Sequence, residues 1–252
     1  MELSQTAAIV TGGASGLGGA TATALAGNGA RVFALDLAEP IAAAERIDGI
    51  TYVETDITDP DQVRAAVDTA AGAGVPLRTV VNCAGIGPSA RILSKKGTHD
   101  LDLFRKVVEV NLIGTFNVTT LAAEAIAKTE PLADDQRGVV INTASIAAYD
   151  GQIGQVAYAA SKGGVVGLNL PAARDLASVG IRVLTIAPGI IDTPMLATVG
   201  EDVRAGLAAG VPFPKRLGRP DEYAQLVLDL VGHDYLNGEV IRLDGSLRMA
   251  PR

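Results

Sequence analysis

Several residue types are scarce in this sequence, and each shortage excludes a class of protein. Among 252 residues there are one cysteine, Cys83, two histidines and no tryptophan. A single cysteine cannot form an internal disulfide, and with so few histidines the ligand set of a structural zinc site is missing. We therefore expect neither a secreted, disulfide-stapled protein nor a metal centre.

Positive charge and aromatic side chains are scarce as well. The chain has 21 Lys and Arg against 28 Asp and Glu, a net charge of -7, and 4% aromatic residues. It offers no cluster of cations to neutralise phosphates and no aromatic platform for bases, so we expect no nucleic-acid ligand. The start of the chain, residues 1–13, lacks the basic residues and cleavage site of a signal peptide, and no apolar run reaches the roughly 18 residues of a membrane span. These features predict a cytoplasmic protein with no membrane partner.

Short apolar runs are the most abundant feature. With 48% hydrophobic and 19% charged residues, the chain has ample material for a core. Runs rich in Val and Ile recur at residues 7–11, 31–35, 50–53, 78–82, 139–143, 181–186 and 239–243. Such runs suit strands that are buried on both faces, and the segments between them carry Ala and Leu at helical spacing. The alternation predicts an α/β fold, a doubly wound, mainly parallel sheet of seven strands of the Rossmann type with helices on both faces.

The chain shows no internal repeat, no low-complexity tract and no linker that would separate two cores, so residues 1–252 are predicted to form one domain. Two longer connections, residues 86–99 and 188–217, follow the fourth and sixth strands. Ligands of doubly wound sheets bind beyond the carboxyl ends of the strands. We therefore expect both connections to form walls of a substrate site.

A glycine-rich turn follows the first strand. The sequence TGGASGLG places Gly12, Gly16 and Gly18 where a helix begins. Because glycine has no Cβ and a helix N-terminus offers free N–H groups with a partial positive charge, a pyrophosphate can approach this backbone closely. The Gly-x-x-x-Gly-x-Gly spacing differs from the commoner dinucleotide spacing, and tight packing of strand against helix would explain the glycines equally well.

An acidic residue, Asp36, ends the second strand at about the distance from the turn that a dinucleotide site requires. A carboxylate there can accept hydrogen bonds from both hydroxyls of an adenosine ribose and would repel a 2′-phosphate. No Arg or Lys follows Asp36 in DLAEP, and the glycine turn contains no arginine. NAD is therefore predicted in preference to NADP, and the N-terminal half of the chain is the dinucleotide-binding half. The alternative is a simple strand-end acid.

Two further segments suit the same nucleotide. Asp56 and Ile57 follow the third strand and can frame the adenine, although TDITDP also suits a helix cap with Thr58 or Asp59 as the capping residue. The fourth strand ends in residues that leave backbone room beside a ribose: Asn82, Cys83, Ala84 and Gly85. The cysteine is predicted to be a small packing residue, since nothing near it in the sequence would activate a thiolate.

Three polar residues in the second half of the chain suit proton transfer. Tyr158 and Lys162 are four residues apart in YAASK, on one face of a predicted helix, and Ser145 follows the fifth strand. A free tyrosine with a pKa of about 10 is a poor base, but a fixed ammonium and a nicotinamide cation would both stabilise its phenolate. Tyr158 is thus predicted to accept the proton, with Ser145 on the substrate oxygen and Lys162 on the nicotinamide ribose. A Tyr–Lys pair alone would as readily decorate a helix surface, so the prediction depends on the ordered combination with the glycine turn, Asp36 and NCAG.

In that order, TGGASGLG, NCAG, Asn111, Ser145 and Tyr158-x-x-x-Lys162 resemble the short-chain dehydrogenase/reductase family over the whole chain. The resemblance implies that Asn111, within a predicted long helix, helps to hold a water-linked proton path to Lys162. Without the family, Asn111 would be a helix-interior polar residue with a local hydrogen bond. The resemblance also implies further cofactor contacts, from Ser15, Leu17, Pro188, Gly189, Ile191 and Thr193, and substrate contacts from Gln152 and Gln155, either of which equally suits a loop cap.

Within the family, KKGTHDL, NLIGTFNV and VPFPKRLG resemble members that interconvert 3-hydroxyacyl-CoA and 3-oxoacyl-CoA with NAD, and the resemblance implies a homotetramer. Ile190, Ile191 and Asp192 depart from that pattern, as does a shortened stretch before the long helix, which leaves the substrate open. Hydroxysteroid dehydrogenase and NADP-dependent 3-oxoacyl carrier-protein reductase are the enzyme alternatives, and Asp36 counts against the second. A non-catalytic dinucleotide sensor or scaffold is the alternative from another class, which retention of the serine, tyrosine and lysine disfavours. The C-terminal segment EVIRLDGSLRMAPR suits either packing on a neighbouring subunit or a final strand with a loose tail.

Overall fold

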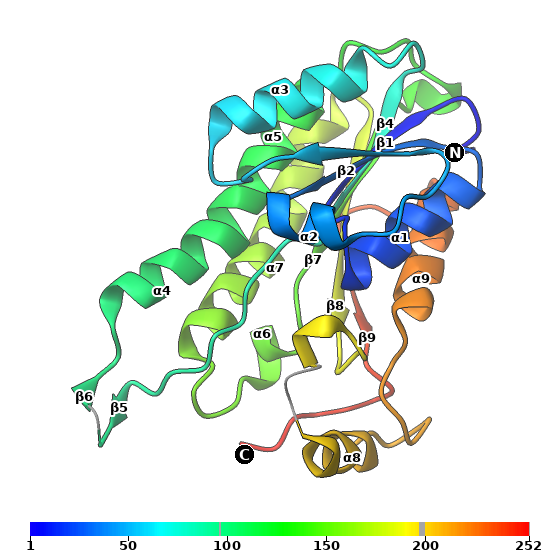
Figure 1. The fold of residues 1–252 in the computed structure, drawn as a ribbon. Coiled ribbons are helices and arrows are strands. Elements are labelled where there is room, and N and C mark those ends of the chain that lie inside the picture. The colour runs from blue at the N-terminus through cyan, green and yellow to red at the C-terminus, as the bar shows by residue number, and fades with distance from the viewer. Residues whose placement is uncertain (96, 197–199, 252) are drawn as a thin grey trace.

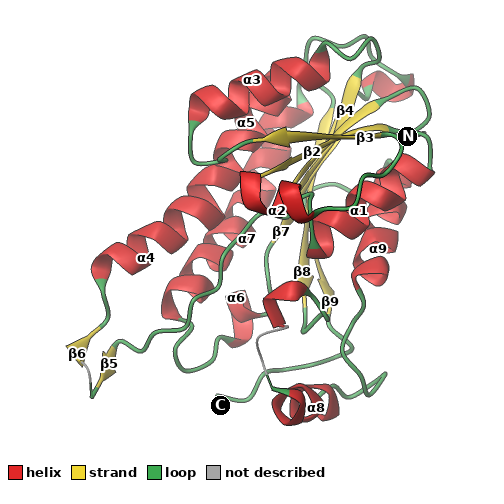
Figure 2. Cartoon of the chain, in the orientation of Figure 1, coloured by secondary structure: helices red, strands yellow, loops and turns green. Residues whose placement is uncertain are grey.

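A seven-stranded parallel sheet runs through the protein, in the order β3-β2-β1-β4-β7-β8-β9 (Figures 1 and 2). The structure, a computed structural model, describes residues 1–95, 97–196 and 200–251. The strands are β1 (Ala7–Thr11), β2 (Arg31–Asp36), β3 (Ile50–Glu54), β4 (Leu77–Asn82), β7 (Gly138–Thr143), β8 (Ile181–Pro188) and β9 (Val240–Leu243). The predicted fold class is confirmed, because the expected strands occur in parallel register with only small differences at their ends.

Helices cover both faces of the sheet. On one face α1 (Gly16–Gly27) packs against α9 (Pro220–Gly232), and on the other α3 (Pro60–Ala71) and α5 (Thr115–Ile126) lie with α7 (Val156–Ala177). Each face has its own apolar core, and β1, β4, β7 and β8 are buried along their whole length. Burial on both faces explains why these strands are continuous apolar runs rather than alternating ones.

The predicted long helix around Asn111 is present but not uniform. It begins as α4 (Leu101–Val108), continues through a π-helical segment (Glu109–Gly114) and ends as α5. Single π-helical turns within α-helices are frequent at functional sites. Here the wide turn contains the buried Asn111.

Residue Asp59 begins α3 as its N-cap, and its carboxylate accepts from the backbone N–H groups of Asp61 at 2.9 Å and Gln62 at 3.3 Å. Of the two capping residues considered for TDITDP, the structure therefore has Asp59 in that position. A short helix, α2 (Ala38–Ala43), follows β2.

The two long connections lie beyond the carboxyl ends of the strands. Residues 86–99 contain a small hairpin of β5 (Leu93–Ser94) and β6 (Gly97–Thr98), and residues 188–217 contain α8 (Glu201–Ala209); residues 96 and 197–199 lie outside the described residues. Figure 1 shows the hairpin, α8, α6 (Ala147–Asp150) and the C-terminus together at its lower end. Short 3-10 segments occur at Ala133–Asp135 and Pro194–Leu196. Within the described part of the chain, no helix has the length and apolar character needed to cross a membrane.

Candidate active site

The glycine-rich turn packs tightly between β1 and α1. Gly12 and Gly16 have φ angles of +64° and +55°, in the left-handed region that favours glycine. A Cβ on Gly12 would lie 3.0 Å from the Cα of Ala84, and a Cβ on Gly18 would lie 2.2 Å from the carbonyl oxygen of Gly12. The close-packing explanation therefore describes Gly12 and Gly18. Gly16 is different, because a Cβ there would make only ordinary contacts with the segment after β8, 3.6 Å from Pro194 Cδ and 3.8 Å from Thr193 Cβ.

Beside this turn lies the carboxylate of Asp36. Its Oδ2 accepts from the backbone N–H of Ala14 at 3.1 Å, and its Oδ1 accepts from that of Leu37 at 2.9 Å. Each carboxylate oxygen can accept more than one hydrogen bond, so both remain able to accept from ligand hydroxyls. The sequence prediction put an acid near the turn, and the structure has it bonded to the turn itself.

The end of β4 is fastened to the end of β1 by Thr11, a residue that sequence reasoning missed. Its Oγ1 accepts from the N–H groups of Cys83 and Ala84, both at 3.1 Å. The side chain of Asn82 is buried and donates to Asn142 Oδ1 at 2.9 Å and to Thr119 Oγ1. The side-chain amide of Asn82 thus links β4 to β7 and to α5. Only the backbone of Asn82 lies at the carboxyl end of the strand, where a ligand could approach it.

A buried cluster of Cys83, Thr143 and Tyr223 lies beneath the site. The Cys83 sulfur lies 3.6 Å from Thr143 Oγ1 and 3.7 Å from the Tyr223 hydroxyl, and burial raises the pKa of the Cys83 thiol. The Tyr223 hydroxyl and Thr143 Oγ1 are 2.7 Å apart. Tyr223 also escaped sequence reasoning, since in the sequence it reads as one more apolar position of α9. These contacts suit the packing role predicted for Cys83.

After β3, Asp56 and Ile57 take different environments. Asp56 Oδ1 accepts from the N–H and the hydroxyl of Thr58, at 2.9 and 2.7 Å. Ile57 is buried against the π-helical segment, where a Cβ on Gly114 would lie 2.7 Å from its Cδ1. The Ile57 carbonyl accepts from Asn117 Nδ2 at 3.0 Å, which ties this loop to α5.

The structure brings Ser145, Tyr158 and Lys162 together where β7 ends and α7 begins. Hydrogen bonding with the Ser145 side chain lowers the pKa of Tyr158. Lys162 Nζ lies 5.9 Å from the centre of the Tyr158 ring and donates to the Thr143 carbonyl at 2.7 Å. Ser145 Oγ in turn accepts from the N–H of Ala147 at 3.1 Å, which fixes its position.

Burial shifts both titratable groups of this set. It raises the pKa of Tyr158, against the hydrogen bond with Ser145, and it lowers the pKa of Lys162 to about 8. Lys162 is only 4% exposed, so the helix-surface explanation of the Tyr–Lys pair is wrong. Burying the charged side chain of a lysine lowers the stability of the folded protein. Groups whose pKa is shifted in this way are concentrated at functional sites.

The amide of Asn111 joins the π-helical turn to the segment that follows β4. Its Oδ1 accepts from Ile86 N at 2.8 Å, and its Nδ2 donates to Ile86 O at 2.9 Å and to Ser161 Oγ at 3.0 Å. A Cβ on Gly85 would lie 3.1 Å from Asn111 Oδ1 and 3.4 Å from Lys162 Nζ. The structure therefore places Asn111 and Lys162 around the same backbone position, Gly85.

The side chains of both glutamines are hydrogen-bonded to backbone groups of the protein. Gln155 Oε1 accepts from Gln152 N at 2.9 Å, and Gln152 Nε2 donates to the Ala250 carbonyl at 2.9 Å. The Ile153 N–H donates to the Pro251 carbonyl at 3.0 Å, so the C-terminal segment lies on this loop. Gln155 thus acts as the loop cap that the sequence left open as an alternative, whereas Gln152 ties the loop to the C-terminal segment.

Beside that loop is a cavity of about 380 Å³. It is lined by residues 90–93 of the hairpin connection, residues 151–156 and Ala159, the neighbour of Tyr158. The 86–99 connection, which the sequence predicted to be a substrate wall, thus forms one wall of this cavity.

The segment after β8 crosses from Ser145 towards the glycine turn. Pro188 O accepts from Ile146 N at 3.0 Å, Gly189 N donates to Leu243 O at 2.9 Å, and Ile191 is buried. With Thr193 opposite Gly16, this segment runs from the surroundings of Ser145 to the glycine turn.

Comparison with known proteins agrees with this geometry. A family model described as short chain dehydrogenase matches residues 6–204. The chain is 51% identical over 249 residues to 3-hydroxyacyl-CoA dehydrogenase type-2 of Homo sapiens, covering 97% of this chain and 95% of that protein. It is 34% identical to the 3-oxoacyl-[acyl-carrier-protein] reductase FabG of Thermotoga maritima, covering 98% and 99%.

A solved structure gives the same result in three dimensions. The crystal structure of 3-hydroxyacyl-CoA dehydrogenase type-2 from Mycobacterium avium superposes with a TM-score of 0.92 at 45% identity, covering 98% of each chain. Matching sequence, fold and strand order extend over nearly the whole length, and the enzyme family is therefore shown. The chain belongs to the short-chain dehydrogenase family of oxidoreductases.

Proposed function

We propose that this protein is an NAD-dependent oxidoreductase that interconverts a 3-hydroxyacyl-CoA and the corresponding 3-oxoacyl-CoA. The observation that carries the reaction type is the convergence of Ser145, Tyr158 and the buried Lys162 at one end of the sheet. The substrate class is supported by relatives named 3-hydroxyacyl-CoA dehydrogenase type-2, about half identical over nearly the full chain.

In the proposed reaction Tyr158, as its phenolate, accepts the proton of the substrate alcohol during oxidation, and the resulting hydroxyl returns this proton during reduction. Ser145 donates to the reacting oxygen, and the Lys162 ammonium favours the phenolate. One N–H of the Lys162 ammonium donates to the Thr143 carbonyl, and the other N–H groups remain available to a ribose hydroxyl. The nicotinamide ring, when bound, takes up or supplies the hydride.

The residues present fit a dinucleotide. A Cβ at Gly16 would lie 3.8 Å from Thr193 Cβ, so the glycine keeps the start of α1 free of a side chain opposite Thr193. The carboxylate of Asp36, already bonded to Ala14 N, lies where it can also accept from ribose hydroxyls. In the proposed complex the pyrophosphate lies at the N-terminus of α1 and the nicotinamide near Pro188, Gly189, Ile191 and Thr193.

The experiment is an assay of purified protein with NAD and 3-hydroxyacyl-CoAs of several chain lengths, read by NADH absorbance. Steroid alcohols with NAD, and a 3-oxoacyl carrier protein with NADPH, test the two enzyme alternatives in parallel. Turnover confined to acyl-CoAs supports the proposal. NADH binding without turnover of any substrate would instead support a dinucleotide sensor.

Tyr158→Phe tests the proton acceptor. The ring stays in place while the hydroxyl is lost, so turnover should fall by at least about a hundredfold and the Kd for NADH should change little. Steady-state kinetics and calorimetry on the same preparation measure both quantities. Near-normal turnover in the folded variant would remove Tyr158 from the mechanism.

Asp36→Ala tests cofactor choice. A hydrogen bond to a charged group contributes about 1.5 to 3 kcal/mol, so the unmodified enzyme should prefer NAD at least about tenfold in kcat/KM before any repulsion of the 2′-phosphate. The variant should use NAD less well and narrow that preference, while efficient use of NADP should also need an added arginine. An unchanged ratio of the two kcat/KM values would contradict this role for Asp36.

We propose further that the protein is a cytoplasmic homotetramer. Large apolar side chains remain exposed on the long helices, including Ile113 at 46%, Phe116 at 51% and Leu170 at 45%, which suits burial against other copies. The single free thiol suits a reducing compartment. Light scattering of the purified protein tests the assembly, and fractionation of the source cells tests the location.

A further inference from the structure

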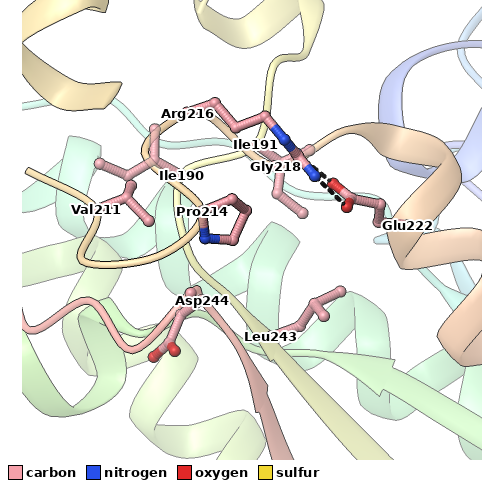
Figure 3. A pocket seen from close by; sticks show the side chains of 10 residues that line it. Ile190, Ile191, Val211, Pro214, Arg216, Gly218, Glu222, Leu243 and Asp244 are labelled. Carbon is pink, nitrogen blue, oxygen red and sulfur yellow. Dashed lines mark hydrogen bonds and ion pairs between the residues drawn. The ribbon is translucent and has the colours of Figure 1, made fainter. Parts of the chain in front are cut away.

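An ion pair at the start of α9 has no part in the chemistry proposed above. Arg216 Nη1 lies 2.8 Å from Glu222 Oε2, and Arg216 Nη2 lies 2.7 Å from Glu222 Oε1. This is a bidentate ion pair, which Figure 3 shows. Such paired bonds fix orientation as well as distance. Hydrogen bonding from Arg216 lowers the pKa of Glu222 to about 2, so the pair stays ionised at any ordinary assay pH.

The same carboxylate closes the first turn of α9. Glu222 Oε2 accepts from Arg219 N at 2.8 Å, and Glu222 N donates to Arg219 O at 3.1 Å. Arg216 Nη1 also donates to the Leu217 carbonyl at 3.0 Å. The ion pair and these backbone bonds therefore fix the residues on either side of Gly218, which are Leu217 and Arg219.

Gly218 is bonded to the segment that follows β8. Its N–H donates to the Ile190 carbonyl at 3.0 Å, and its carbonyl accepts from Asp192 N at 2.9 Å. Together these bonds make an isolated parallel bridge opposite Ile191. The approach is close, because a Cβ on Gly218 would lie 3.1 Å from Ile191 Cγ1.

Packing on this side of the segment is incomplete. A cavity of about 110 Å³ is lined by Ile190 and Ile191, by Val211 and Pro214, and by the ion pair at one edge; Figure 3 shows these side chains. Side chains beside empty space lose dispersion contacts on that side. The hydrogen bonds to Gly218 therefore add to the burial of Ile191 in holding residues 190–192 in place.

Immediately after this bridge comes Thr193, which faces Gly16 across the proposed cofactor space. We propose that Arg216 and Glu222 are positioning residues for the nicotinamide half of the cofactor, which they hold in place through Gly218 and residues 190–192. The inference rests on the NAD binding proposed above. Neither side chain touches the cofactor or the substrate in this arrangement.

Glu222→Gln tests the inference, because it keeps the size of the side chain but turns an amide N–H₂ towards the guanidinium. Calorimetry should compare NADH with ADP-ribose, which lacks the nicotinamide ring. We expect the variant to bind NADH about tenfold more weakly and ADP-ribose within about twofold of the unmodified protein. In steady state the KM for NAD should rise more than kcat falls. The backbone amides of Gly218 and Asp192 should exchange hydrogen faster.

Asp221→Asn is the matched control. It makes the same change of charge in the same helical turn, at an exposed residue whose side chain bonds to Arg219 Nε at 3.1 Å rather than to Arg216. Both ligands should bind to this control within about twofold of the unmodified protein. Arg216→Lys keeps the charge but loses the bidentate contact. This variant should weaken the binding of NADH by a smaller factor than Glu222→Gln does, and it should leave the binding of ADP-ribose unchanged.

The outcomes separate the inference from the proposed function. Equal weakening of NADH and ADP-ribose, or no change in either, in Glu222→Gln and Arg216→Lys would overturn the positioning role while leaving NAD binding intact. An effect of Asp221→Asn as large as that of Glu222→Gln would also overturn it. Failure of the unmodified protein to bind NADH or ADP-ribose would overturn the proposed function, and the inference with it.

Discussion

At the scale of single residues, Lys162 is the group whose burial most plainly serves chemistry at the expense of stability. The side chain is 4% exposed, and its ammonium donates to the Thr143 carbonyl but forms no ion pair with a carboxylate of the described residues that would offset desolvation. An uncharged side chain of similar length would fill the same space without the desolvation free energy of a buried charge. Retention of the amine is therefore informative about function rather than about folding.

Lys162→Met should show this trade directly. The lysine has a pKa of about 8 in the folded protein and 10.5 as its ordinary value. Between these values the unfolded chain binds the proton and the folded protein does not, so the stability of the unmodified protein should rise as pH increases from 8 to 10.5. The methionine variant lacks this contribution. Its stability relative to the unmodified protein should therefore be most favourable near pH 7 and decline towards pH 10.5, while its turnover falls at least about a hundredfold.

Urea denaturation of the two proteins at a series of pH values measures the difference. Lys128→Met is the control, since Lys128 lies on the surface with its ammonium 3.0 Å from Glu124 and 72% of its side chain exposed. A difference between Lys162→Met and the unmodified protein that does not vary with pH would mean that Lys162 titrates at its ordinary value.

At the scale of elements, the strands were predictable because burial on both faces leaves a local trace in sequence. Residues 139–143 and 181–186 are apolar for a reason that acts position by position, and their observed counterparts β7 and β8 are buried throughout. The cap of α3 was equally local, since Asp59 bonds within its own first turn. Motif order then located the candidate site, because parallel strands bring their carboxyl ends to one edge.

Elements whose geometry depends on distant partners could not be predicted in this way. The π-helical turn at Asn111 exists together with bonds to Ile86 and Ser161, which are remote in sequence. Gln152 meets Ala250 only because the chain returns to that loop after nearly a hundred residues. The bridge from Gly218 to residues 190–192 likewise has no local sequence pattern, which is why the role of Arg216 and Glu222 emerged only from three-dimensional contacts.

At the scale of the whole molecule, the two halves of the chain share their cores. Helix α1 from the first half packs on α9 from the second, and Leu25 and Val227 belong to one apolar cluster on that face. On the opposite face, Val63 of α3 and Ala173 of α7 belong to another. The sheet is continuous across both halves through β4 and β7. Neither half can separate without exposing apolar surface on both faces, which supports the proposal of one domain.

Thermal unfolding should therefore occur in a single transition, and bound cofactor should raise the midpoint temperature of that whole transition. The protein has no tryptophan, so fluorescence follows its five tyrosines, of which Tyr52 in β3 lies in the first half and the other four lie in the second, while far-ultraviolet circular dichroism follows the helices. The two signals should coincide at fixed protein concentration. A ligand at a hundred times its Kd stabilises the folded state by about 2.7 kcal/mol, so NADH at that excess should raise the shared midpoint by roughly 5 to 10 °C. Two separate transitions, of which NADH shifts only one, would show that the nucleotide half folds independently and that the single-domain proposal is wrong.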